Sequence, residues 1–323
     1  MTIEQLDISI KNSKNILLVS HMNPDGDTLG SMCGLFSIIK DNYKKKCDMA
    51  AVSKVPAIYN FIPYIEEVKY IENFDLSREY DLVINLDVAA LNRCGDAQIL
   101  FNKAKKTINI DHHETNINYG NLNFVEPEAS ATAEVIVELS QSLNWKISSK
   151  TAVCLYTGIM TDTGCFKFSN TTQKTMEYAG KLLSYGVQPS VIYQNCYESN
   201  SKDMVLFQSY CVSKAKFLNN DKIAYTVVYK KDLEKYNYNG EDFTDGLTEK
   251  LRAIQSTEIA FVVKELNAAT SKLSMRSKNL NIANVCSVFG GGGHKLAAGA
   301  VIKANVADSV KMILEEISKQ KLC

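Results

Sequence analysis

The chain has 323 residues, of which 46% are hydrophobic, and its 36 Lys and Arg residues balance its 36 Asp and Glu residues. This length favours two domains over a single core. The lack of a basic excess argues against a long nucleic-acid track, because binding along many phosphates needs many cations. The nine cysteines are scattered without a C-x-x-C pair, which argues against a thiolate zinc cluster or a disulfide framework and favours reduced thiols.

The sequence shows no pattern that is typical of a secreted or membrane-spanning protein. Residues 1–7 lack the cationic start and apolar run of a signal peptide. No uninterrupted apolar segment approaches the ~20 residues that a membrane span needs. We therefore expect a cytoplasmic protein without a membrane partner.

The first half of the chain alternates β-rich runs with helical patterns. The predicted strands cover residues 15–20, 47–52, 80–86 and 106–110, and the predicted helices cover 28–40, 56–63 and 96–104. Helical patterns follow at 132–143, 149–161, 171–185 and 190–197. Strands that alternate with helices imply crossover connections, so we expect an α/β fold with a doubly wound, mostly parallel sheet.

A polar run, ESNSKD at 198–203, marks a boundary, and the pattern after it is that of a smaller α+β domain. The predicted helices there cover 204–216, 281–288 and 306–319, and the predicted strands cover 223–229, 258–264, 272–276 and 297–302. We expect a catalytic domain over residues 1–197, a linker and helix over 198–215, and a second domain over 216–323.

Three predicted strands of the first domain end in acidic and imidazole side chains. These are His21, Asp25 and Asp27 after the first strand, Asp87 after the third, Asp111, His112 and His113 after the fourth, and Asp162 at the end of the helix at 149–161. The carboxyl ends of parallel strands lie at one edge of a sheet, where ligands bind, so we expect these side chains to meet.

A single Asp after a strand often caps a helix, and Asp27 alone fits that interpretation. The whole set does not, because converging carboxylates repel one another unless cations neutralise them, and caps do not account for the histidines. Imidazole with carboxylate and no thiolate suits Mn²⁺, with Mg²⁺, Co²⁺ or Fe²⁺ as alternatives. The set exceeds the needs of one ion, which favours two ions that share a carboxylate. Two ions ~3.5–4 Å apart clamp an in-line displacement at phosphorus.

The second domain contains a candidate phosphate site in GGGGHKLAAGA, residues 290–300. The backbone N–H groups of Gly291, Gly292 and Gly293 would approach an anion closely, although glycine runs alone also fit a flexible loop. His294 and Arg276 favour phosphate recognition, because Arg offers a bidentate fork to phosphate oxygens.

Two further residues each have a functional and a structural interpretation. Ser274 would donate a hydrogen bond to the ligand or lie on a strand edge. Arg93, six residues after Asp87, would reach a phosphate or form a surface ion pair.

The motifs together resemble a known superfamily. HMNPDGD at 21–27, the segment around Asp87, DHH at 111–113 and GIMTDTGCF at 158–166 are similar to the motifs of the DHH phosphoesterases. SMRS at 274–277 and the glycine-rich segment at 290–300 resemble the DHHA1 substrate domain. In size and layout the chain is most similar to the NrnA type, the oligoribonuclease and pAp-phosphatase proteins.

The resemblance implies a role for each residue of the first domain. One Mn²⁺ would be held by His21, Asp25 and Asp87, and the second by Asp27, Asp87, His112 and Asp162, with Asp87 bridging. His113 would face the substrate as a proton donor or a phosphate contact. Asp111 would orient a ligand histidine.

The resemblance implies hydrolysis of short oligoribonucleotides or of 3′-phosphoadenosine 5′-phosphate (pAp) by metal-activated water. Short DNA oligonucleotides are also expected as substrates, a cleft between the domains would limit substrate length, and a homodimer is expected. The alternatives are a phosphodiesterase for cyclic dinucleotides such as c-di-AMP or for their linear product pApA, a RecJ-like single-strand exonuclease, and a catalytically silent nucleotide sensor.

Overall fold

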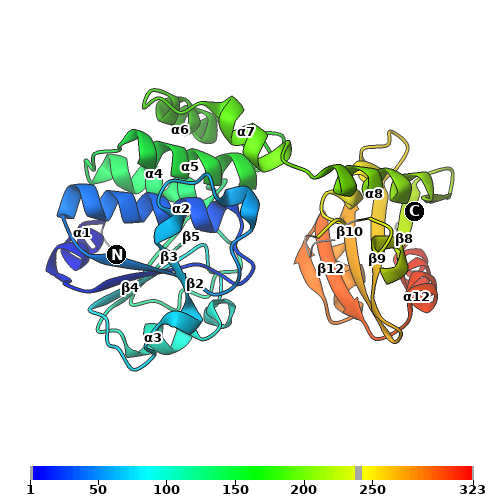
Figure 1. The fold of residues 1–323 in the computed structure, drawn as a ribbon, viewed down its shortest axis with the longest axis horizontal. Coiled ribbons are helices and arrows are strands. Elements are labelled where there is room, and N and C mark those ends of the chain that lie inside the picture. Colours follow the sequence, from blue (N-terminus) through cyan, green and yellow to red (C-terminus); the bar gives the residue numbers. More distant parts are fainter. Residues whose placement is uncertain (1–2, 237–241, 322–323) are drawn as a thin grey trace. The chain divides into compact units, whose positions relative to one another are not determined.

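The computed structural model describes residues 3–236 and 242–321. The chain divides into two compact units, Met1–Ser199 and Asn200–Cys323, and each has its own sheet (Figure 1). The first unit is a parallel sheet covered by helices, and the second, smaller unit is a mixed sheet with helices, so the predicted fold class is confirmed. None of the described helices is long and apolar enough to cross a membrane.

The sheet of the first unit has the strand order β3-β2-β1-β4-β5-β6, and all neighbouring strands described are parallel. The strands are β1 (Ile16–Val19), β2 (Cys47–Ala51), β3 (Val68–Tyr70), β4 (Leu82–Leu86), β5 (Thr107–Asp111) and β6 (Leu122–Val125). The strand order reverses between β1 and β4. Ligands of doubly wound folds bind at the carboxyl ends of strands at such a point.

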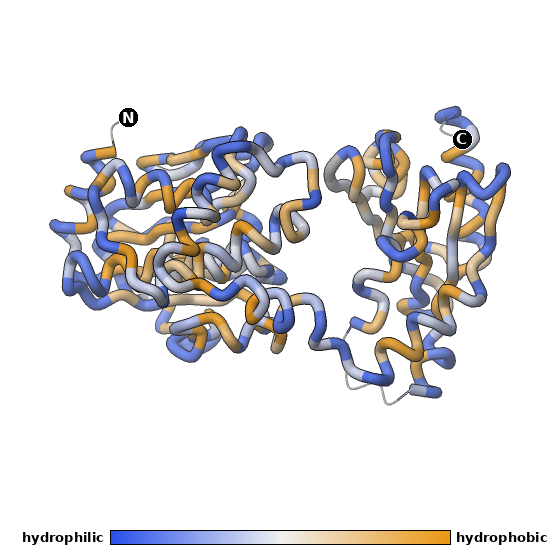
Figure 2. The backbone as a smooth tube through the Cα atoms, turned by 90° about the horizontal axis from the view of Figure 1, so that it is seen from above, coloured by the Kyte–Doolittle hydropathy of each residue, from blue (hydrophilic) through white to orange (hydrophobic). Residues whose placement is uncertain are grey.

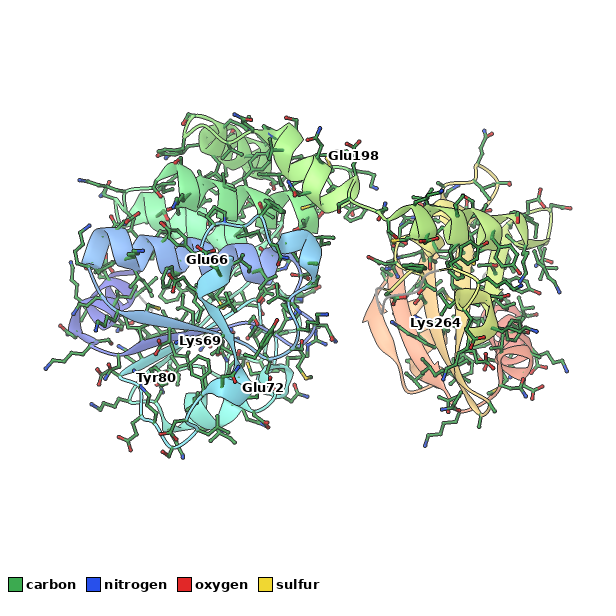
Figure 3. The ribbon with its side chains drawn as sticks, in the orientation of Figure 1. Glu66, Lys69, Glu72, Tyr80, Glu198 and Lys264 are labelled. Atoms are coloured by element: carbon green, nitrogen blue, oxygen red, sulfur yellow. The ribbon has the colours of Figure 1, made fainter. Side chains whose placement is uncertain are left out.

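The two edge strands, β3 and β6, are absent from the sequence prediction because they are short and only partly apolar. β3 has three residues, and the charged side chain of Lys69 is exposed on it (Figure 3). Charged residues on a short edge strand prevent pairing with another chain. The segment at 56–63, predicted as a short helix, forms only a 3₁₀ turn at Ala57–Tyr59.

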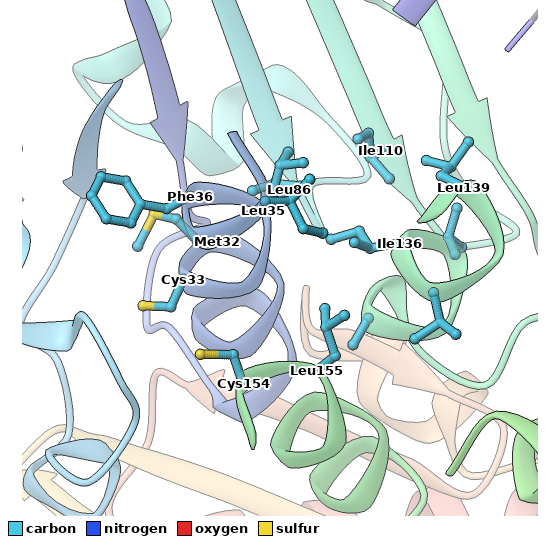
Figure 4. Close-up of a cluster of buried hydrophobic side chains, with 14 of the residues drawn as sticks. Met32, Cys33, Leu35, Phe36, Leu86, Ile110, Ile136, Leu139, Cys154 and Leu155 are labelled. Carbon is cyan, nitrogen blue, oxygen red and sulfur yellow. The ribbon is translucent and has the colours of Figure 1, made fainter. Parts of the chain in front are cut away.

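Helices cover both faces of the first sheet. The helices of this unit are α1 (Ile3–Asn12), α2 (Gly26–Ile38), α3 (Ala97–Lys103), α4 (Thr132–Ser142), α5 (Ser149–Asp162), α6 (Gln173–Leu183) and α7 (Pro189–Tyr197). Of these, α6 and α7 pack against α5 and not directly on the sheet (Figure 1). Alternate strand residues face opposite cores: Leu18 packs in the core that includes α2, α4 and α5, whereas Leu17 packs in the core that includes α3. Figure 4 shows the first of these cores, where Leu86 of β4 lies beside Leu35 of α2.

Helices α2 and α5 run antiparallel and in unusually close contact. A Cβ at Gly30 would lie 2.5 Å from the backbone oxygen of Cys154, and one at Gly34 would lie 2.6 Å from the Leu155 side chain. Glycine therefore permits this approach. Because of it, the first turn of α2, with Asp27, meets the last residue of α5, Asp162.

The sheet of the second unit has the order β11-β12-β10-β9-β8-β7, in which β8 and β9 are parallel and the other described pairs are antiparallel. Its strands are β7 (Lys216–Leu218), β8 (Ile223–Val228), β9 (Ile259–Asn267), β10 (Thr270–Ser277), β11 (Gly292–His294) and β12 (Ala297–Ile302). Its helices are α8 (Lys202–Ser213), α9 (Lys230–Leu233), α10 (Leu247–Arg252), α11 (Ala283–Val288) and α12 (Val306–Lys319).

Two hydrophobic cores lie on opposite faces of this second sheet. Phe261 belongs to the core that includes α11 and α12, and Val262 belongs to the core that includes α8 and α10. In both units, hydrophobic segments run through the interior strands (Figure 2). The glycine-rich run is not a loop throughout, because Gly292–His294 pairs with β12 as strand β11.

Candidate functional site

The carboxyl edge of the first sheet brings the expected acidic and imidazole side chains together. His21 follows β1, Asp87 follows β4 directly, and His112 and His113 follow β5. Three groups of side chains have potential ligand atoms within 4.8 Å of one another, namely His21 with Asp25 and Asp87, Asp27 with His112 and Asp162, and Asp87 with His112 and His113. Asp87 is thus common to two of these groups, and His112 joins it to the third.

Asp87 lies between the two imidazoles. Its Oδ2 is 3.2 Å from Nε2 of His21, and its Oδ1 is 3.6 Å from Nε2 of His112. The side chain is only 4% exposed, and the residue has a φ of 62°. A left-handed conformation is uncommon outside glycine and is found at strained functional positions. The backbone thus turns at the strand end and places one carboxylate in contact with both sides of the site.

Both histidines are oriented by backbone carbonyl groups. Nδ1 of His21 lies 2.8 Å from the Met22 oxygen, and Nδ1 of His112 lies 3.2 Å from the Ala129 oxygen. Each Nδ1–H donates to its carbonyl, so each Nε2 faces the carboxylates and, in the neutral ring, has a lone pair available to a metal ion. This is the usual arrangement of a histidine that binds a metal ion.

The amino end of helix α4 holds Asp27. Its two oxygens accept from the backbone N–H groups of Thr132 and Ala133, at 2.6 and 2.9 Å. Helix amino ends stabilise anions. The hydroxyl of Thr132 also donates to Oδ1 of Asp87 at 3.1 Å. The start of an amphipathic helix at 132 was visible in the sequence, but its contact with residues about a hundred positions earlier was not.

Asp25, and not Asp27, caps helix α2. Its Oδ1 accepts from the backbone N–H groups of Asp27 and Thr28, each at 3.1 Å. The simple helix-cap interpretation of Asp27 is therefore wrong.

The site contains more carboxylates than imidazoles, so a bound cation would offset its excess of negative charge. Burial and the adjacent Asp87 carboxylate raise the pKa of Asp27 to about 7. Burial, then the charges of Asp27 and Asp87, raise the pKa of Asp162 well above its usual value. Burial alone would lower the pKa of His21, but Asp25 and Asp87 outweigh it and raise the pKa to about 10. Carboxylates and imidazoles this close fit divalent cations, which would neutralise the carboxylates.

Asp111 has a different partner from the one expected. Its Oδ1 accepts from Nδ1 of His113 at 2.7 Å, so it orients that ring. Its hydrogen bond with His112 comes from the backbone N–H of His112, at 2.8 Å, and not from the imidazole. Its Oδ2 accepts from Nδ2 of Asn116 at 2.5 Å. Asn116 was not predicted as a residue of the site, although it lies only three residues after His113.

Arg93 lies on the same edge of the sheet. It is exposed, and its backbone oxygen accepts from the N–H of Met22, which follows His21. The backbone therefore places Arg93 beside the first group of side chains.

The candidate phosphate residues of the second unit lie on three adjacent strands. Ser274 of β10 pairs with Gly299 of β12, which pairs with Gly292 of β11. Two residues along, Arg276 pairs with Ala297, which pairs with His294. The side chain of His294 lies outside the described part of the structure.

The glycines of this segment differ in what they permit. A Cβ at Gly291 would lie 2.2 Å from the Gly299 oxygen, so packing requires glycine there. Gly293 has a φ of 144°, so its backbone conformation requires glycine. A Cβ at Gly292 would have nothing within 4 Å.

Arg276 has a partner that the sequence did not reveal. Its Nε lies 2.6 Å from Oε1 of Glu249 on helix α10. This six-residue helix was not predicted, and no spacing in the sequence connects its residues to Arg276.

Comparisons with known proteins identify a family for each of the two units. Residues 15–159 match the model of the DHH family, N-terminal domain, and residues 220–320 match the DHHA1 domain. The bifunctional oligoribonuclease and PAP phosphatase NrnA of Bacillus subtilis is 32% identical over 94% of this chain and 95% of its own length. The cyclic-di-AMP phosphodiesterase GdpP of the same organism is 25% identical over 96% of this chain but only 48% of its own.

Among solved structures, an exopolyphosphatase-related protein from Bacteroides fragilis has the same fold. Its TM-score is 0.93 over 99% of this chain and 96% of its own, at 24% sequence identity.

Proposed function

Because the chain belongs to the DHH/DHHA1 phosphoesterase family as an NrnA-like member, we propose that it hydrolyses short oligoribonucleotides and 3′-phosphoadenosine 5′-phosphate. It is a metal-dependent phosphoesterase. The observation that carries this function is the pair of side-chain groups on either side of Asp87, in a chain that aligns with NrnA over 95% of that protein's length.

We propose that the residues hold two divalent ions, most readily Mn²⁺. His21, Asp25 and Asp87 would hold one, and Asp27, His112 and Asp162 would hold the other, with Asp87 shared. When bound, such ions supply Lewis-acid activation of the phosphoester and of the attacking water. Imidazole and carboxylate ligands without thiolate support Mn²⁺, with Mg²⁺ and Co²⁺ as alternatives.

The remaining residues would act on the substrate. His113, whose Nδ1 is held by Asp111, would deliver a proton to the leaving oxygen or contact a phosphate. Arg93 would contact a phosphate near the first group of side chains. In the second unit, Arg276, Ser274, His294 and the glycines at 291–293 would bind a second phosphate of the substrate. The homodimer and the cytoplasmic location stay predictions.

One alternative has a specific observation in its favour. GdpP, named for cyclic-di-AMP, aligns with 96% of this chain, so cyclic dinucleotides or pApA are the second candidate substrates. The alignment covers only 48% of GdpP, whereas NrnA aligns over nearly its whole length. The full-length match favours the oligoribonuclease and pAp activity.

The test is a substrate panel with purified protein in Mn²⁺, containing pAp, a dinucleotide RNA, pApA and c-di-AMP. We expect turnover of pAp and dinucleotide RNA that EDTA abolishes. Asp87→Asn should reduce this turnover by about 100-fold or more, because even groups that only support a metal ligand contribute 10–100-fold.

The matched control is Asp75→Asn, which changes an exposed Asp of the same unit whose carboxylate accepts from the backbone N–H and the hydroxyl of Ser77. It should retain full activity. Exclusive turnover of c-di-AMP would favour the second candidate, and the absence of Mn²⁺-dependent turnover of any substrate would favour a nucleotide sensor.

A further inference from the structure

The guanidinium of Arg276 is held at two points in the free protein. Nε donates to Oε1 of Glu249 at 2.6 Å, and Nη1 donates to the backbone oxygen of Met275 at 3.0 Å. A guanidinium has five N–H donors, so these two bonds leave three, including both donors of Nη2. Two donors are enough for a bidentate contact with phosphate oxygens.

Glu249 is placed rigidly with respect to Arg276. It lies on helix α10 between Leu247 and Leu251, which are fully buried in the core on this face of the sheet. The same core contains Ala260 of β9, the strand residue that pairs with Arg276. The helix is therefore anchored beside the arginine, which fixes the backbone from which the Glu249 carboxylate reaches it.

The arginine and the carboxylate are each only partly exposed, at 29% and 35% of their side-chain surfaces. An exposed ion pair of this kind usually contributes little to stability. A long arginine side chain, however, loses considerable rotamer entropy when it is immobilised at a ligand. A carboxylate that immobilises it beforehand reduces this cost at the moment of binding.

The surroundings of Arg276 are suited to a ligand. It pairs with Ala297, which pairs with His294, and the row two residues along contains Ser274 and Gly292. Among the atoms that the structure describes, none lies within 4 Å of a Cβ built on Gly292, so there is open space beside this strand.

We propose that Glu249 is a positioning residue that holds the Arg276 guanidinium ready for a terminal phosphate of the substrate. This inference rests on the proposed function, since it concerns how the same substrate is bound. It assigns no catalytic step to Glu249. The competing interpretation is that Glu249 occupies the arginine in place of the phosphate and thereby weakens binding.

The test compares Glu249→Ala, Glu249→Gln, Arg276→Ala and the double variant in the full chain. The substrates are pAp, which has two phosphates, and bis(p-nitrophenyl) phosphate, which has no terminal phosphate. For pAp we expect Glu249→Ala to raise KM about tenfold, the size of one hydrogen bond to a charged group, with kcat within about twofold. Turnover of bis(p-nitrophenyl) phosphate should not change.

Two further results would identify the effect as positioning. Glu249→Gln should lose less than Glu249→Ala, because its amide oxygen still accepts from Nε. In the Arg276→Ala background, removal of Glu249 should have no further effect, since the carboxylate acts through the arginine. Glu138→Ala is the matched control, because Glu138 is 38% exposed and forms a 2.7 Å ion pair with Lys174.

A lower KM for Glu249→Ala would overturn the proposal in favour of competition. An unchanged KM for Glu249→Ala, together with a raised KM for Arg276→Ala, would overturn it outright. So would an additional loss in the double variant. Calorimetric binding of pAp in EDTA, with thermal melts as a check of folding, separates this result from the proposed function. A wild-type protein that binds pAp but does not hydrolyse it contradicts the function, while the effect of Glu249→Ala on binding still decides the inference.

Discussion

Asp111 accepts a 2.7 Å hydrogen bond from Nδ1 of His113, and the Asp111 side chain is completely buried. The second oxygen of the same carboxylate accepts from Asn116. The orientation of His113 is therefore fixed by a carboxylate that is itself buried and cannot contact the substrate.

We expect Asp111→Asn to lower kcat by about 10–100-fold with little change in KM, the usual effect of removing a group that orients a residue of the site. The new amide would either turn its NH₂ toward the donor of Asn116 or lose the bond to His113. Steady-state kinetics with pAp measure this effect. Asp81→Asn, at the opposite end of the sheet, is the control and should have normal kcat; an unchanged kcat for Asp111→Asn would contradict the role.

The glycine-rich segment supports a matched pair of substitutions. Gly292→Ala should fold normally, because its Cβ would meet nothing within 4 Å, but it should raise KM if substrate fills that space. Gly291→Ala should lower the melting temperature, because its Cβ would lie 2.2 Å from a backbone oxygen of β12. Thermal melts and pAp kinetics distinguish the two. A normal KM for Gly292→Ala would show that the ligand lies elsewhere.

The contact between α2 and α5 should be intolerant of a methyl group. Gly30→Ala would place Cβ 2.5 Å from the Cys154 carbonyl oxygen. Because this oxygen belongs to the backbone, the two helices would have to move apart, which costs free energy of folding. We expect about 2 kcal/mol of destabilisation, typical of overpacking, measured by urea unfolding. Gly180→Ala on α6, where a Cβ has open space, should instead stabilise the protein by about 0.5–1 kcal/mol. Equal stability of the two variants would rule out the close contact.

Asp81 should make stability depend on acid pH. Its carboxylate accepts from Lys105 at 2.8 Å and from the backbone N–H groups of Lys14 and Asn15, and these bonds, Lys105 first, lower its pKa to about 2. A group with a lowered folded-state pKa contributes stability that is complete above its unfolded value of about 3.9 and is lost as the pH falls toward 2.

With screening by solvent, this contribution is about 1 kcal/mol at neutral pH. Urea unfolding at pH 7 and pH 3 should therefore show a smaller loss of stability on acidification in Asp81→Asn than in the wild type. An identical acid sensitivity of the two proteins would refute the assignment.

The sequence alone predicted the architecture of the first unit because its central strands are buried on both sides. A strand such as Leu82–Leu86, covered by helices on both faces, is apolar except for Asn85, and local pattern detects such a run. Parallel strands then place Asp87 and His112 at one edge, whatever the details of packing. The edge strands Val68–Tyr70 and Leu122–Val125 escaped prediction because partial exposure removes that signal.

Only the tertiary structure decided which side chains touch. Local sequence contains no trace of the bond from Thr132 to Asp87, or of the pairing of Arg276 with Glu249, because each joins segments that are adjacent only after folding. The sequence determined which acidic and imidazole side chains are present and which strands they follow. It could do so because each buried strand is visible in the sequence as a local run of hydrophobic residues. Which acid holds Arg276 depends on distances of a few ångströms, which are fixed by packing between helix α10 and strand β10.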